Sequence, residues 1–227
     1  DGLKQVSDNI AHDLKTPLTR LRNRAEAALA AKQTAPGYRS AIEDMISESD
    51  QLIKTFNAIL MISRLEAGYS QESMSEADLA DIVGDVIELY EPVAEEAGVA
   101  LTRGMIAAVK LQANRELVAQ ALSNIVDNAI KYSHGDSPKP QVRVELRHDG
   151  SNARIVVTDN GPGIPEADRD RATERFVRLE KSRSEPGSGL GLSLAKAVMK
   201  LHKGSLKIGS ANPGLCVELV FPKGPVK

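Results

Sequence analysis

The sequence predicts two domains, an antiparallel helical hairpin followed by a domain in which helices cover one face of a β-sheet. Apolar residues recur at helical spacing through the first third of the chain, in two runs separated by Pro36-Gly37. After a polar stretch at residues 68–77, helical and strand-like segments mix without a strict βαβ alternation. The length of 227 residues suits one large domain or two small ones, and the change of pattern favours two.

Composition excludes some classes of protein and predicts the character of the core. Lys and Arg number 29 against 31 Asp and Glu, so the chain lacks the basic surface of a nucleic-acid-binding protein. Its one cysteine, Cys216, cannot form an internal disulfide, which indicates an intracellular protein. No apolar run approaches the roughly 18 residues of a membrane span. Aromatic residues make up only 3% of the chain, so we expect an aliphatic core.

The first third predicts two helices, each with one apolar stripe. The first stripe comprises Val6, Ile10, Leu14, Leu18, Leu21, Ala25 and Ala28. The second comprises Ile42, Met45, Ile46, Ser49, Leu52, Ile53, Phe56, Ile59 and Leu60, and this helix ends before Gly68. Two helices cannot enclose stripes of this length, so we expect a second copy of the hairpin and a homodimeric four-helix bundle. We assign residues 1–67 to the hairpin, 68–77 to a linker and 78–227 to the second domain.

The sequence of the second domain predicts three helices. Signals for their N-termini lie at Ser75-x-x-Asp78, at Asn114 and at about Leu190. The first has an inward face from Leu79 to Tyr90, the second runs to about Lys131 and the third to Leu201. Strands are predicted at Val99–Thr102, Ala107–Gln112, Val142–Arg147, Ala153–Thr158, Ser205–Gly209 and Leu215–Phe221. Asp149-Gly150-Ser151-Asn152 indicates a hairpin turn between two of these strands.

His12 is the first residue to suggest chemistry. It lies two residues after Ile10, about 200° around a helix, so it points away from the apolar stripe. Asp13 follows it, Thr16 lies one turn further on, and Pro17 weakens the helix because it cannot donate a hydrogen bond to the Asp13 carbonyl. A neutral imidazole beside a carboxylate is a competent nucleophile near pH 7, since the reference pKa of histidine is about 6.5.

Two glycine-rich turns suggest phosphate binding. Asp159-Asn160-Gly161-Pro162-Gly163-Ile164 ends a predicted strand, and Gly187-Ser188-Gly189-Leu190-Gly191-Leu192 opens a predicted helix. Glycines before a helix let backbone amides approach a phosphate, and the helix N-terminus favours negative charge. The turns match neither a P-loop, since no Lys-Ser/Thr pair follows, nor a dinucleotide fingerprint. H-R-D and V-A-I-K motifs of Ser/Thr/Tyr protein kinases are also absent from the sequence.

A third group of candidate residues lies on the helix that follows Asn114. Asn124, Asn128 and Lys131 are four and three residues apart, which places two amides and an ammonium group on one face. Amides inside an apolar helix disfavour folding unless they have partners, and Mg²⁺ with phosphate oxygens is a suitable partner. Capping or interhelical hydrogen bonds are the structural alternative.

Four of these segments resemble the motifs of one family. His12–Pro17 resembles the phosphoacceptor H-box of sensor histidine kinases, and Asn124–Ser133 resembles their N-box. Asp159–Gly163 and Gly187–Gly191 resemble their first and second glycine boxes, in the family's order. The resemblance covers essentially the whole chain. It implies an α plus α/β fold, in which a dimeric helical bundle precedes an α/β-sandwich ATP-binding domain with a mixed sheet and a flexible lid, shared with DNA gyrase and mismatch-repair ATPases.

The resemblance also implies roles in binding the base and the metal. Asp159 would accept a hydrogen bond from the adenine amino group, and Gly161 and Gly163 would leave room for the base. Asn128 would ligate the Mg²⁺ that bridges the phosphates of ATP. Asn124 would line the same pocket.

The remaining implied roles concern the phosphates. Lys131 and Tyr132 would contact phosphate or ribose, and Arg178 matches an arginine that would neutralise the γ-phosphate. Thr173 stands where the family has a second aromatic residue, three residues before Phe176, so the resemblance does not carry over the anchoring of the lid. The phosphate tail would be held by backbone amides around Gly187, Gly189, Leu190 and Gly191.

By resemblance, His12 accepts a phosphoryl group from MgATP with Asp13 as base, and passes it to an aspartate on the receiver domain of a response regulator. Asp13-x-x-Thr16 resembles the family's phosphatase motif, in which Thr16 orients a water. Residues 161–188 are read as the lid and residues 68–77 as a hinge.

Two alternatives stay open at this stage. A catalytically silent adaptor or a phosphatase-only partner would keep the ATP pocket and dock a regulator without autophosphorylation. An ATP-driven clamp of the gyrase type would hydrolyse ATP independently of His12. The apolar stripe already begins at Leu3, and the resemblance leads us to expect an upstream membrane-anchored sensor, with this chain as its cytoplasmic part.

Overall fold

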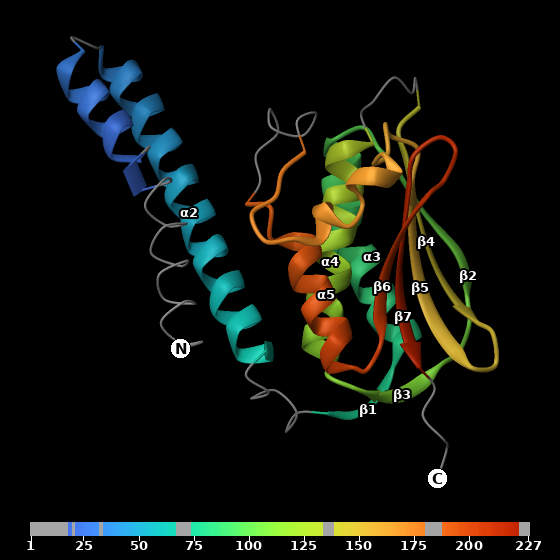
Figure 1. The fold of residues 1–227 in the computed structure, drawn as a ribbon. Coiled ribbons are helices and arrows are strands. Elements are labelled where there is room, and N and C mark those ends of the chain that lie inside the picture. Colours follow the sequence, from blue (N-terminus) through green and yellow to red (C-terminus); the bar gives the residue numbers. More distant parts are fainter. Residues whose placement is uncertain are drawn as a thin grey trace. The chain divides into compact units, whose positions relative to one another are not determined.

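The computed structural model describes residues 18–19, 21–31, 34–66, 74–133, 139–179 and 188–222. The chain divides into two compact units, Asp1–Ser63 and Arg64–Lys227. The first is helical and the second combines helices with sheets (Figure 1). The predicted fold class is therefore confirmed. None of the described helices combines the length and the apolar character that crossing a bilayer requires.

The helical unit is a hairpin, as the apolar spacing predicts. Residues 18–19 and 21–30 are helical, and α2 runs from Ala35 to Glu66. The predicted break at Pro36-Gly37 is wrong, because both residues lie in the first turn of α2. Proline is tolerated there because the N–H groups of a first turn have no acceptor within the helix. The Tyr38 hydroxyl donates to the Ala31 carbonyl at 3.1 Å, which ties the two helices at the turn.

The apolar stripes of the hairpin are not covered within a single chain. Ile42, Ile46 and Ile53 of α2 are 52%, 57% and 55% exposed, although their spacing marks them as core residues. An open groove of about 540 Å³ runs between the two helices, lined by Leu18, Leu21, Arg22, Ala25, Ile42, Met45, Ile46 and Ser49.

The second unit contains a five-stranded mixed sheet in the order β2-β4-β5-β7-β6. Its strands are β2 (Ala100–Ile106), β4 (Gln141–His148), β5 (Asn152–Asp159), β6 (Ser205–Ser210) and β7 (Leu215–Pro222). β2 pairs in parallel with β4, and the other pairs are antiparallel. The predicted hairpin turn between β4 and β5 is confirmed, since the Asp149 carboxylate accepts the backbone N–H of Asn152 at 2.8 Å.

Three helices cover one face of this sheet, as predicted (Figure 1). They are α3 (Leu79–Glu96), α4 (Arg115–Tyr132) and α5 (Gly191–Leu201). The buried residues between helices and sheet are mainly aliphatic, which confirms the prediction from composition. The largest include Leu79, Ile82, Leu122, Ile125, Leu146, Ile155, Leu194, Met199, Leu219 and Phe221.

A two-stranded antiparallel ribbon corrects the predicted start of this unit. Ser75–Asp78 forms β1, which pairs with β3 (Lys110–Ala113) instead of opening a helix as a capping box. The cap of α3 is Asp78, whose side chain accepts from the Ala80 N–H at 2.9 Å. The strand predicted at Ala107–Gln112 is displaced, because β2 continues to Ile106 and β3 begins only at Lys110. These pairings join residues far apart in sequence, which a local pattern does not reveal.

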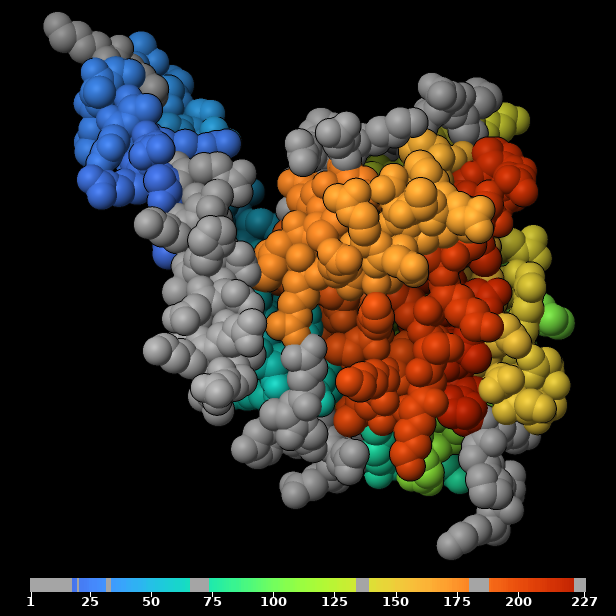
Figure 2. Space-filling view, viewed as in Figure 1, coloured from blue at the N-terminus to red at the C-terminus, as the bar shows by residue number. Residues whose placement is uncertain are grey.

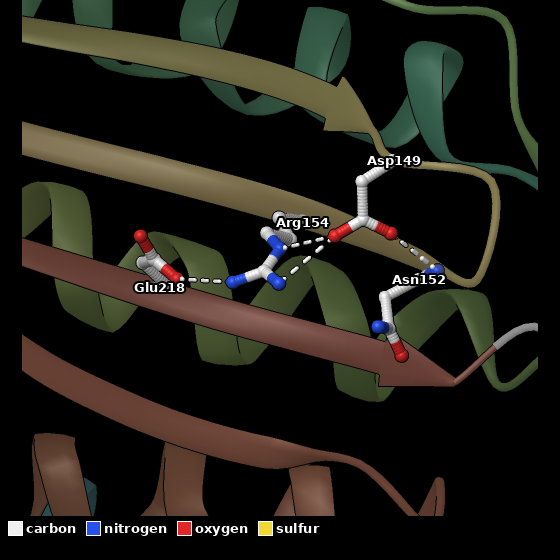
Figure 3. A network of polar contacts seen from close by, with 4 residues as sticks. All are labelled: Asp149, Asn152, Arg154 and Glu218. Carbon is white, nitrogen blue, oxygen red and sulfur yellow. Dashed lines mark hydrogen bonds and ion pairs between the residues drawn. The ribbon is translucent and has the colours of Figure 1, made fainter.

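The face of the sheet opposite the helices carries charged residues in ion pairs. Arg154 on β5 contacts Asp149 of the hairpin turn at 2.9 Å and Glu218 on β7 at 3.1 Å (Figure 3). Glu145 on β4 is paired with Arg143 and Arg147. Charge on this face is thus balanced within the sheet.

The segment that follows β5 contains two short 3-10 helices, Glu166–Asp168 and Arg171–Thr173. It corresponds to the first part of the predicted lid. Figure 2 shows it in light orange on the surface beside α5. Residues 180–187, the rest of that predicted lid before Ser188, lie outside the described residues.

Candidate functional site

The polar residues of α4 form a face beside an apolar one. Asn114 caps the helix as predicted, since its side chain accepts the Leu117 N–H at 3.0 Å. Asn124 and Asn128 are half-buried one turn apart, and each is followed by two buried apolar residues. Neither side chain hydrogen-bonds to another residue in the described part of the chain. Two amides are thus available on this face for a ligand.

The N-terminus of α5 meets these two amides. A Cβ placed on Gly191 would lie 3.2 Å from Asn128 Nδ2 and 3.6 Å from Asn124 Cβ. Leu190 precedes the helix and provides no side-chain cap. The first amides of α5 therefore have a positive partial charge and no side-chain acceptor at Leu190, which suits an anion.

Asp159 ends β5 as a buried carboxylate, 6% exposed. Its Oδ1 accepts the backbone N–H groups of Gly161 at 2.9 Å and Leu215 at 3.2 Å. Burial raises the pKa of Asp159, and the two backbone hydrogen bonds oppose that rise. No described residue donates to its Oδ2. One oxygen is fixed by the backbone and the other is left to accept from a ligand.

The first glycine turn brings Asp159 to the end of α4. A Cβ on Gly161 would lie 2.1 Å from the Tyr132 carbonyl oxygen, so only glycine permits this approach. Gly163 has a φ of +67°, and a Cβ there would lie 2.9 Å from the Gly214 carbonyl oxygen. The first glycine turn thus packs closely between the end of α4 and the β6–β7 connection.

The second glycine turn is joined to the segment that carries Arg178. The Phe176 N–H donates to the Gly189 carbonyl at 3.1 Å, and both residues have positive φ values, 61° and 71°. A Cβ on Gly189 would lie 2.9 Å from the Phe176 carbonyl carbon. Arg178 is half-buried two residues later. A non-glycine residue at positive φ stores backbone strain, which is common beside functional sites.

The structure pairs Lys131 with a neighbour on its own helix. Its Nζ lies 2.5 Å from Asp127 Oδ2, one turn back, and both side chains are about one-third exposed. Tyr132 follows, with a half-buried side chain and with its carbonyl against Gly161. Lys131 therefore lies beside the amide face but is held by a carboxylate.

The structure thus gathers Asn124, Asn128, Lys131, Tyr132, Asp159, Gly161, Gly163, Gly189, Leu190 and Gly191 around the ends of α4, β5 and α5. His12, Asp13, Thr16 and Gly187 lie outside the described residues. Among the described residues, no three His, Cys, Asp or Glu side chains gather as a metal site.

Sequence reasoning missed two contacts near the site. Gly214 has a φ of +105°, and a Cβ there would lie 1.8 Å from the Asp159 carbonyl oxygen. The residues Asn212-Pro213-Gly214 are typical of a turn, a signal that could have marked this position, but only the fold shows which residue the turn supports. Lys196 of α5 donates to Thr173 Oγ1 at 2.9 Å, so a polar bond holds the segment where the family has an aromatic residue.

Comparison with known proteins identifies the family. The family model described as "Histidine kinase-, DNA gyrase B-, and HSP90-like ATPase" matches residues 113–225, and the model described as "His Kinase A (phospho-acceptor) domain" matches residues 3–68.

Sensor-like histidine kinase SenX3 of Mycolicibacterium smegmatis is 32% identical over 96% of this chain and 56% of that protein. Sensor protein IrlS of Burkholderia pseudomallei is 35% identical over 92% of this chain and 44% of that protein. The chain belongs to the sensor histidine kinases of two-component systems. It spans about half the length of these curated relatives.

Solved sensor histidine kinases share the fold. The mycobacterial sensor histidine kinase MprB is 30% identical with a TM-score of 0.57, covering 67% of this chain and 99% of that one. Full-length ShkA in complex with AMPPNP is 25% identical with a TM-score of 0.69, covering 97% and 46%. ThkA in complex with the response regulator TrrA is 21% identical with a TM-score of 0.73, covering 99% and 63%, a likeness of fold alone.

Proposed function

We propose that this chain is the kinase core of an ATP-dependent histidine autokinase that phosphorylates His12. The observation that carries this proposal is the convergence of three features. The free amides of Asn124 and Asn128 face the uncapped N-terminus of α5, and the backbone holds one oxygen of Asp159 at the end of β5. Together they provide an acceptor for a base at one end and donors for phosphates at the other.

The residues fit a nucleotide with its magnesium ion. Asp159 Oδ2 accepts from the adenine amino group, and the absence of a Cβ at Gly161 leaves space for the base. Asn128 supplies an amide oxygen, a ligand type that Mg²⁺ accepts alongside phosphate oxygens. Asn124 lines the same pocket. Mg²⁺, when bound, neutralises charge on the phosphates and fixes their geometry.

The phosphates are held by α5 and by cationic side chains. Backbone amides from Gly187, Gly189, Leu190 and Gly191 donate to the phosphate tail. Lys131, near Tyr132, exchanges its Asp127 partner for a phosphate or ribose oxygen. Arg178 approaches the γ-phosphate when the segment after Phe176 closes, and stabilises the charge that develops there.

In the proposed reaction, Nε2 of His12 attacks the γ-phosphorus of ATP. The N–P bond forms while the bond from phosphorus to the bridging oxygen breaks, and ADP leaves. Asp13 accepts the proton from Nδ1. The phosphoryl group then passes to an aspartate on a response regulator, and Thr16 orients a water for hydrolysis of that phosphoaspartate. ThkA, a histidine kinase that was solved in complex with the response regulator TrrA, has the same fold as this chain.

We also propose that the chain acts as a homodimer. The hairpin leaves an apolar groove and three isoleucines more than half exposed, a surface that a soluble monomer rarely keeps. A second hairpin of the same sequence supplies a matching stripe and completes a four-helix bundle. From the sequence pattern we also propose the domain bounds 1–67 and 78–227 with a hinge at residues 68–77, and from the family a membrane-anchored sensor upstream.

The test is incubation with γ-labelled MgATP, followed by assays of acid lability and base stability. We expect the wild type to take up acid-labile, base-stable label, and His12→Ala and Asn128→Ala to take up none. His148→Ala, which changes an exposed histidine of β4, is the matched control and keeps the label. A wild type that binds ATP without taking label contradicts the proposal and favours a silent adaptor or a phosphatase. Hydrolysis that survives His12→Ala would favour an ATP-driven clamp.

A further inference from the structure

His202 is a buried titratable residue that the proposed reaction does not use. It directly follows α5 and is 9% exposed. Its ring packs edge-on against Phe221 of β7, with centroids 5.8 Å apart and an interplanar angle of 80°. The ring therefore lies in the core between α5 and the sheet.

Both ring nitrogens of His202 have backbone partners that fix its protonation state. Nε2 lies 3.0 Å from the backbone nitrogen of Asn114, whose N–H can only donate. Nδ1 lies 2.8 Å from the Val198 carbonyl oxygen, which can only accept. The proton therefore sits on Nδ1, and Nε2 must stay unprotonated to accept. In a protonated ring, the Nε2–H group of His202 would face the backbone N–H group of Asn114, and neither could accept a hydrogen bond.

The partner of Nε2 is the residue that starts α4. The Asn114 side chain caps that helix at Leu117, and the same helix carries Asn124 and Asn128. α5 therefore contacts α4 at both of its ends, through His202 at Asn114 and through Gly191 at Asn128. These two contacts lie about 21 Å apart along α4. A shift of α4 at one contact changes the alignment of the amides at the other.

We propose that neutral His202 is a positioning residue for the nucleotide site, because it fixes the N-terminus of α4 against α5 and so aligns Asn124 and Asn128 with the first amides of α5. The inference rests on the proposed nucleotide binding and adds to it a control by protonation. When His202 gains a proton, the Asn114 N–H loses its acceptor, and affinity for MgATP falls.

The pKa of His202 is set by burial and by its backbone partner, and the charged residues nearby do not shift it. Arg115 and Glu116 flank the contact on α4, and Arg115 is engaged with Asp85. Lys200 at the end of α5 and Lys203 just after it flank the ring, whereas β7 has no charged residue next to Phe221. Burial lowers the pKa of His202, and the Val198 carbonyl partly opposes this. Among the described residues, no charged side chain contributes to this lowering of the His202 pKa.

The experiment measures the dissociation constant for MgATP between pH 5.5 and 8 on the full chain. We expect wild-type affinity to fall towards acidic pH more steeply than that of His202→Gln, which is neutral throughout and keeps an acceptor. His202→Phe, which keeps an aromatic ring against Phe221 but no acceptor, should bind about tenfold more weakly at pH 8. His148→Gln, an exposed histidine, is the matched control and should follow the wild type.

Urea unfolding and amide hydrogen exchange on the same samples separate positioning from loss of fold. We expect His202→Phe to remain folded at pH 8 while amides of α4 near Asn114 and Asn124 exchange faster. Wild-type affinity in folded His202→Phe, unchanged exchange in α4, or equal pH profiles for the wild type and His202→Gln would each overturn the inference. A wild type that binds no MgATP at any pH, with normal protection of α4, overturns the proposed function instead.

Discussion

Two buried carboxylates on neighbouring strands differ in what surrounds them. Asp159 at the end of β5 and Glu145 on β4 are 6% and 7% exposed. Burial raises the pKa of Asp159, and only backbone N–H groups oppose it. Burial also acts on Glu145, but hydrogen bonds and charges of Arg147 and Arg143 outweigh it and lower its pKa. The charge of Glu145 is therefore balanced by two arginines of its own strand. The charge of Asp159 is met only by backbone N–H groups among the described residues.

The difference supports the proposal that Asp159, unlike Glu145, belongs to a ligand site. A buried carboxylate without a cationic partner costs folding free energy, and groups with such perturbed pKa values cluster at functional sites. The outer face of the sheet instead pairs its charges, as Arg154 does with Asp149 and Glu218 (Figure 3). The end of β5 is therefore where we expect substitutions to affect binding more than stability.

The largest effect should come from Asp159→Asn. The amide still offers an oxygen to the Gly161 and Leu215 N–H groups, but its NH₂ group replaces the acceptor that we propose for the adenine amino group. A lost hydrogen bond to a charged group is worth roughly 1.5–3 kcal/mol, so affinity for ATP should fall about 10- to 100-fold in equilibrium titration. Glu145→Gln is the matched control, with nearly unchanged affinity. Similar losses in both variants would contradict the comparison.

Gly161→Ala should have the next largest effect. Its Cβ would overlap the Tyr132 carbonyl oxygen at 2.1 Å, and relief of such overpacking costs about 1–3 kcal/mol. Urea unfolding should show this loss together with weaker ATP binding. Gly84→Ala in α3, where a Cβ meets nothing within 4 Å, should instead stabilise the protein by about 0.5–1 kcal/mol. Equal stability of the two variants would show that the turn can move aside.

The two carboxylates should also give opposite dependence on pH. The pKa of Asp159 is raised in the folded state, so its contribution to stability is complete below the ordinary value near 3.9 and is lost as pH rises through the folded pKa. The pKa of Glu145 is lowered, so its contribution is present above about 4.3 and is lost as pH falls through the folded pKa. Urea unfolding from pH 3 to 7 should show Asp159→Asn gaining stability relative to wild type with rising pH, and Glu145→Gln losing it. Parallel curves would contradict this assignment.

The smallest effect should come from Lys196→Ala. The lost bond to Thr173 is exposed and competes with water, so we expect affinity for ATP to fall about twofold. Stopped-flow displacement should show the change as faster nucleotide release. Lys200→Ala removes the same charge from α5 and is the control, because no hydrogen bond joins Lys200 to the described part of the predicted lid. A larger effect of Lys200→Ala would assign the change to charge alone.

Local signals predicted most of the second unit. Asn114 and Asp149-Gly150-Ser151-Asn152 were identified as a cap and a turn because each acts on backbone groups within a few residues. The amide face of α4 followed from helical spacing. β1 was missed because Ser75–Asp78 is short and polar, and its strand character depends on β3, more than thirty residues away.

The sequence alone determined the order of the helices and of the strands other than β1, the two glycine turns and the spacing of Asn124 and Asn128, because helical periodicity and glycine conformations are local properties. Only the tertiary structure decided that Asp159 has no cationic partner among the described residues and that His202 accepts from Asn114. These states depend on which distant groups share a low-dielectric interior, and burial and hydrogen bonding there set both protonation and alignment.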